Sequence, residues 1–167
     1  MNAKEFVDSA RQSYPDLPDA KTLSLLEQSA EFIFAVCEEL NKTVSVADRD
    51  LALYITKLYI KFYTEEPNEF DYDWNDPFRM CGLLLYKIGN VEDSLLLWQI
   101  KEIDMDTAGG LEVQMLTGAG VDETIAYSKS LKTEFALKGA ELIEANRGYF
   151  PDFVETFETY FGYRTTG

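Results

Sequence analysis

The sequence predicts an all-α protein, a single-domain irregular helical bundle or a short solenoid of helix hairpins over residues 1–167. Apolar residues recur at intervals of three and four along most of the chain, which is the spacing of one helix face. Proline and glycine divide these stretches into segments of helical length, and no segment is a convincing strand. The length suits one domain, and the 46% of hydrophobic residues can supply its core.

Three helices are predicted in the first part of the chain. A helix over residues 3–14 ends before Pro15, because proline cannot continue a helix. A long amphipathic helix follows over residues 19–41. Ser45 and Asp48 have the spacing of a capping box, which predicts the start of a third helix that stops before the next proline.

Further helices follow after residue 76. Asp76 precedes a proline, an arrangement typical of a helix start, and Gly89 has the position of a helix terminator. Asn90 is expected to cap the next helix, which is apolar nearly all round and therefore predicted to be the most buried. The remaining predicted helices are one capped by Asp106 and ending at Gly118, two over 121–128 and 131–146, and one starting at Pro151.

The charge of the chain limits its partners. Thirty acidic residues face fifteen basic ones, giving a formal net charge of −15. Such a field repels phosphate backbones and anionic membrane surfaces, so we expect neither a nucleic acid nor a membrane as partner. It attracts basic proteins, polyamines and metal cations. Acidity also promotes solubility in proteins that have no basic partner.

The cysteines and the N-terminus favour a cytoplasmic protein. Cys37 and Cys81 lie far apart in apolar helical surroundings, where free cysteines behave as small hydrophobes. This pattern indicates no disulfide framework and is typical of a reducing compartment. The first residues lack the apolar region of a signal peptide, and no apolar run approaches the ~18 residues of a membrane span.

Several kinds of catalytic site are excluded by composition and spacing. The chain has no histidine, so it lacks the commonest general base and zinc ligand. The segment 71–75 begins like a calcium-binding loop, but Asp76 and Gly82 stand where its glycine and glutamate should be. We therefore predict no enzyme activity, no cofactor and no metal site. Weak divalent cation binding by Asp104 and Asp106 is left open.

One segment stands out as a candidate binding element. Residues 64–76 carry six acids and no base, and three aromatic residues alternate with polar ones. Aromatic side chains supply rigid contact area, and carboxylates can pair with arginine or lysine of a partner. In the alternative interpretation, the aromatic residues cover a helix hairpin while the acids face solvent. The predicted partner-binding residues are Glu69, Phe70, Asp71, Tyr72, Asp73 and Trp74.

Three stretches resemble a known group of proteins. They are Gly89-Asn90-Val91-Glu92-Asp93-Ser94-Leu95-Leu96-Leu97-Trp98 continuing to Lys101, Asp104-Met105-Asp106-Thr107, and Gly118-Ala119-Gly120-Val121-Asp122-Glu123-Thr124-Ile125-Ala126-Tyr127. Together they resemble small helical immunity-type proteins of bacterial polymorphic toxin systems, over roughly residues 78–130. The resemblance implies a protein that binds and neutralises a co-encoded toxin. It assigns no binding residue and leaves the N-terminal half unassigned.

Three functions are weighed on this basis. The first is a cytoplasmic inhibitor of the immunity type that neutralises a basic toxin domain, for example a nuclease, through its acidic surface. The second is a helical adaptor or scaffold that binds proteins without inhibiting them. The third is a metal-dependent enzyme that uses only carboxylates. The oligomeric state is not readable from the sequence.

Overall fold

The computed structural model describes residues 1–65 and 75–149, and the segments 66–74 and 150–167 lie outside the described residues. Within the described ranges all regular structure is helical, which confirms the all-α prediction. The α-helices are α1 (Ala3–Ser13), α2 (Ala20–Leu23), α3 (Ala30–Lys42), α4 (Arg49–Glu65), α5 (Asn75–Ile88), α6 (Asp93–Lys101), α7 (Met105–Gly110), α8 (Val121–Ser130) and α9 (Glu134–Asn146). Short 3₁₀ helices are η1 (Leu26–Gln28), η2 (Val46–Asp48), η3 (Val113–Thr117) and η4 (Arg147–Tyr149).

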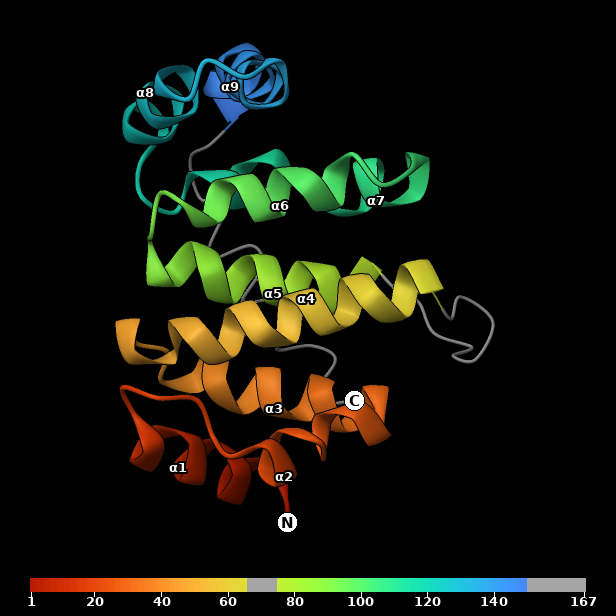
Figure 1. Cartoon of the computed structure of the whole chain (residues 1–167). Helices are drawn as coiled ribbons and strands as arrows, with labels where there is room; N and C mark the ends of the chain where they lie inside the picture. Colours follow the sequence, from red (N-terminus) through yellow and green to blue (C-terminus); the bar gives the residue numbers. More distant parts are fainter. Residues whose placement is uncertain (66–74, 150–167) are drawn as a thin grey trace.

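The helices are stacked in successive layers that follow the order of the chain (Figure 1). The layer of α1 and α2 is followed by α3, then α4 and α5, then α6 with α7, and finally the α8–α9 hairpin. Neighbouring layers are in contact through α1 and α3, α3 and α5, α5 and α7, and α6 and α9. A continuous cluster of buried apolar side chains runs through these layers from Phe6 to Ile143.

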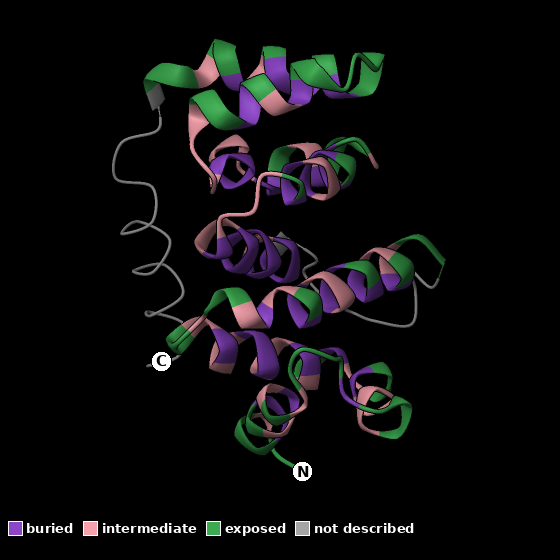
Figure 2. Ribbon diagram, turned by 60° about the vertical axis from the view of Figure 1, so that its left-hand side comes forward, coloured by how far each residue is buried: buried purple, intermediate pink, exposed green. Residues whose placement is uncertain are grey.

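The most buried helix is α5, and not α6 as the sequence predicted. Leu95 and Leu96 of α6 are only half-buried. In α5 almost every side chain is buried, and Figure 2 shows this helix as a nearly unbroken buried layer. The reason is position, because α5 packs against α3 and α4 on one side and against α7 and η3 on the other. A Cβ atom at Gly82 would collide with Met115 of η3, so glycine permits this close approach.

The predicted helix over residues 19–41 is wrong as one continuous element. It divides into α2, η1 and α3, and Ser29 separates the last two with an extended backbone. The Ser29 side chain accepts a hydrogen bond from the Phe32 amide at 3.2 Å and so caps α3. The apolar spacing continues across this break, which explains why periodicity alone did not reveal it.

Other predicted boundaries have mixed outcomes. The Ser45–Asp48 capping box is confirmed and opens η2, which leads into α4. Gly89 ends α5 with a positive φ of 72°, as expected of a glycine terminator. Asp76, however, lies inside the first turn of α5. Asn90 caps a turn, its Oδ1 accepting from the Glu92 amide at 3.0 Å, and α6 begins only at Asp93.

Two further predictions concern the ends of the chain and its surroundings. The helix predicted from Pro151 lies outside the described residues, so the structure does not test it. Among residues 1–65 and 75–149, no helix has the length and apolar character needed to cross a membrane.

Candidate functional site

The six predicted partner-binding residues, Glu69 to Trp74, all fall in the segment that lies outside the described residues. The structure does describe the two helices that this segment joins. Helix α4 ends at Glu65 and α5 begins at Asn75. The rings of Tyr63 and Phe78 meet edge to face with centroids 5.5 Å apart, so the facing ends of the two helices are packed together.

The start of α7 also contacts the end of α4. The Tyr63 hydroxyl donates a hydrogen bond to Oδ2 of Asp104 at 2.5 Å, joining residues 41 positions apart. Asp104 is the N-cap of α7, because its Oδ1 accepts from the Thr107 amide at 2.9 Å and Thr107 Oγ1 accepts from the Asp104 amide at 3.1 Å. The prediction of Asp106 as this cap, with the helix ending at Gly118, is therefore wrong, since α7 covers only Met105–Gly110.

The hydrogen bond between Tyr63 and Asp104 shifts the pKa values of both side chains. Partial burial of Tyr63, together with its hydrogen bond to Asp104, raises the pKa of the phenol to about 12. The charge of Asp106 acts in the same direction, which places this carboxylate nearby. The pKa of Asp104 is lowered, first by the hydrogen bond from the Thr107 amide and then by that from Tyr63. Asp104 is therefore charged at neutral pH.

We refer to Tyr63, Asp104, Met105 and Asp106 as the acidic corner. Met105 lies between the two exposed aspartates, and 88% of its side chain is exposed, more than for any other large hydrophobic residue in the described ranges. No lysine or arginine among the described residues forms a hydrogen bond or ion pair with Asp104 or Asp106. The corner thus presents negative charge without a basic partner among the described residues, next to an apolar side chain. Tyr63, one of its residues, precedes the segment 66–74 by three positions in the sequence.

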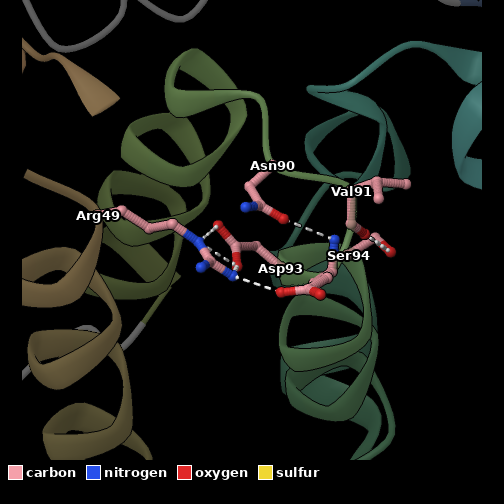
Figure 3. A network of polar contacts seen from close by, with 6 residues as sticks. Arg49, Asn90, Val91, Asp93 and Ser94 are labelled. Carbon is pink, nitrogen blue, oxygen red and sulfur yellow. Dashed lines mark hydrogen bonds and ion pairs between the residues drawn. The ribbon is translucent and has the colours of Figure 1, made fainter. Parts of the chain in front are cut away.

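At the other end of α4, carboxylates have a different environment (Figure 3). Arg49 forms ion pairs through Nη2 with Oδ1 of Asp93 at 2.6 Å and with Oε2 of Glu92 at 3.1 Å. Asp93 is only 3% exposed. Since the buried carboxylate of Asp93 is neutralised by a guanidinium, this cluster links α4 to α6 and Asp93 has a structural role.

A similar ion pair joins the first layers of the stack. Arg11 donates to both carboxylate oxygens of Asp48, at 2.8 and 3.0 Å, and also to the Thr43 carbonyl oxygen at 3.1 Å. Burial alone would raise the pKa of Asp48, but hydrogen bonds from Arg11 and the Ser45 amide outweigh it and lower the pKa. This carboxylate is likewise committed to the fold.

The described residues supply little that could act as a catalytic centre. Among them, no group of three or more cysteine, aspartate and glutamate side chains is arranged to hold a metal ion. Cys37 and Cys81 are both free and buried. A hydrogen bond between the two thiols, together with burial, raises the pKa of Cys37 well above its usual value, so the thiol stays protonated and is a poor nucleophile.

Comparisons with known proteins assign no family. No protein-family model matches the chain, and no match was found among the curated proteins or the solved structures.

The acidic corner was only partly visible in the sequence. Asp104 and Asp106 are candidates for cation binding in the sequence and Met105 belongs to a stretch that carries the resemblance, but nothing in the sequence connects Tyr63 with them. The hydrogen bond between Tyr63 and Asp104 depends on how the layers stack, and no local pattern indicates it. The available signal in the sequence is a methionine between two aspartates.

Proposed function

We propose that this chain is a protein-binding inhibitor of the immunity type, which neutralises a basic toxin or enzyme domain by docking it on its acidic surface. The observation that carries the proposal is the acidic corner, where the exposed Asp104 and Asp106 flank the exposed Met105 in the sequence and have no basic partner among the described residues. The corner adjoins the acidic and aromatic segment 66–74, which contains the predicted contacts Glu69 to Trp74.

In the proposed binding, long-range electrostatic attraction and short-range apolar contacts act at different stages. A net charge of −15 increases the rate of encounter with a basic protein, and this attraction weakens as salt is added. Aromatic side chains and Met105 would then supply apolar contact area after encounter. Carboxylates that have no basic partner among the described residues would be available to pair with arginine or lysine of the partner.

The test is capture of a partner by the tagged full chain from lysate of the organism that encodes it, at about 0.1 M and about 0.5 M salt. We expect one basic protein to be retained at low salt and released at high salt. Inhibition of that protein's activity by the purified chain would distinguish an inhibitor from an adaptor. Retention that does not depend on salt would favour the adaptor, which would dock through an apolar groove.

The location of the interface is tested by the double variant Asp71→Asn with Asp73→Asn. We expect it to weaken partner binding by about tenfold or more, because two charge-assisted contacts are lost. The matched control is Asp16→Asn with Asp50→Asn, two exposed aspartates remote from the corner, which changes the net charge equally. Calorimetric titration measures both, and equal weakening by the two double variants would contradict an interface at residues 69–74.

A further inference from the structure

A buried lysine lies at the end of α6 and contacts the end of α7 opposite to the acidic corner. Lys101 is only 9% exposed. Its Nζ donates hydrogen bonds to the carbonyl oxygens of Ala108 and Leu111, each at 2.5 Å. These carbonyls belong to the C-terminal end of α7 and have no partner within that helix, so the first role of Lys101 is to cap α7.

The charge of Lys101 lacks a counter-ion. Among the described residues, no carboxylate forms an ion pair with Nζ. Glu112 and Glu102 favour the charged form from a distance, but Glu112 is paired with Arg79 at 3.1 Å and Glu102 is exposed to solvent. Burial has the larger influence and lowers the pKa of Lys101. Since buried cations in proteins are normally paired, this arrangement is unusual.

Lys101 lines a groove of about 620 Å³ formed between α9 and the α7–η3 segment. Its apolar walls include Ala108, Val113 and Leu142, and Asn146 adds an amide. Gly109 lies on the wall, where an added Cβ atom would meet no other atom within 4 Å. Small-molecule sites have volumes of this size, mostly apolar walls and a few polar groups, and this groove differs from most of them in being open to solvent.

We propose that this groove binds a small organic carboxylate with an apolar body. An ammonium has three N–H donors, and two are used on the α7 carbonyls, which leaves one without a partner among the described residues. The proposed ligand accepts from this third N–H. The carboxylate supplies the missing counter-charge to Lys101, while the apolar body covers Val113 and Leu142. Two-point recognition of this kind discriminates against inorganic anions, which gain nothing from the walls, and against neutral apolar molecules, which do not compensate the charge.

The site does not depend on the protein-binding function, since its ligand and its location are different. The probe is hexanoate, added to the isotopically labelled full chain and followed by amide chemical shifts. Hexanol and inorganic phosphate serve as comparison ligands. We expect saturable shifts around Lys101 and Leu142 with hexanoate, at a concentration about tenfold lower than either comparison ligand requires. Equal affinity for hexanol or for phosphate would overturn the proposal, as would the absence of saturable shifts.

Two variants test the location of the site. Gly109→Leu adds a bulky side chain on the groove wall, at a glycine where an added Cβ atom meets nothing within 4 Å, and its matched control is Gly148→Leu, at a second glycine where the same holds. Hexanoate binding should fall about tenfold in the first variant and stay unchanged in the second. Unchanged binding in Gly109→Leu would contradict the proposal.

Lys101→Met should abolish the preference for hexanoate over hexanol, and retention of that preference would count against a role for the ammonium. Because this substitution also removes the cap of α7, the Gly109 variant keeps the proposal testable if Lys101→Met does not fold.

Discussion

The two ends of helix α4 are both attached to the layer of α6 and α7, but through opposite electrostatic arrangements. At its start, Arg49 neutralises the buried Asp93 and also pairs with the exposed Glu92. At its end, Asp104 accepts hydrogen bonds from uncharged donors, the Tyr63 hydroxyl and Thr107, and Asp106 has no basic partner among the described residues. A cation therefore balances the buried carboxylate at the first end, whereas no cation among the described residues pairs with the two aspartates at the second end.

The largest effect on stability is expected at the Arg49 end. Arg49→Leu leaves the carboxylate of Asp93, which is 3% exposed, without its counter-ion. Removing one partner of a buried ion pair costs about 3 kcal/mol or more, because the remaining charge is desolvated and unpaired. Urea unfolding of the two proteins measures the difference in the free energy of unfolding.

The control for Arg49 is Arg147→Leu. Arg147 pairs with Asp122 and Glu144, whose side chains are 81% and 53% exposed. Surface pairs of this kind contribute about 0 to 1 kcal/mol. A similar small loss for both variants would show that the Arg49 cluster is no more structural than an ordinary surface pair.

An intermediate effect is expected at the Tyr63 end. Tyr63→Phe keeps the ring contact with Phe78 and removes the hydrogen bond to Asp104, so a loss of about 1 kcal/mol follows at neutral pH. The pKa of Tyr63 is about 12 in the folded chain, above its usual value of 10.0. A raised pKa means that the stabilisation is present below pH 10 and is lost as the pH rises toward 12.

Urea unfolding of the wild type and of Tyr63→Phe at neutral and at alkaline pH tests whether the stabilisation by Tyr63 falls as the pH rises. The stability difference between the two proteins should shrink as the pH rises through this window, because the tyrosine must then ionise beside Asp104 and Asp106. A difference that is constant across the window would show that the phenol does not sense these carboxylates.

The predictions from sequence were most accurate where the signal is local. The Ser45–Asp48 capping box and the terminator Gly89 each depend on groups within a few residues, and both are confirmed. The N-cap of α7 was predicted incorrectly although its signal is also local. Asp104 and Asp106 are both plausible caps, and Asp104 has the partner Thr107 three residues later, which completes a capping box.

Contacts that depend on how the layers stack could not be predicted from local sequence patterns. The Arg49–Asp93 ion pair joins residues 44 positions apart. No sequence pattern near Arg49 indicates which of the thirty acidic residues is its partner. The burial order of α5 and α6 has the same origin. Leu95 and Leu96 are as apolar as the leucines of α5, but α6 contacts the helices of the adjoining layers, α5 and α9, much less extensively than α5 contacts α3, α4 and α7. Burial of a helix therefore follows from its place in the stack as well as from its composition.

The smallest effect on stability is expected for Met105→Gln in the acidic corner. With 88% of its side chain exposed, Met105 loses little packing, so the free energy of unfolding should change by less than about 0.5 kcal/mol. Binding to the basic partner should weaken by about three- to tenfold, because an apolar contact between two carboxylates is removed. The control is Val46→Gln, which is 75% exposed and lies in η2, just before Arg49 at the opposite end of α4. If the two ends of α4 differ in function as they differ in charge pairing, only the Met105 variant reduces affinity in a calorimetric titration. Equal affinity of both variants would mean that the corner lies outside the interface, even if the segment 69–74 is inside it.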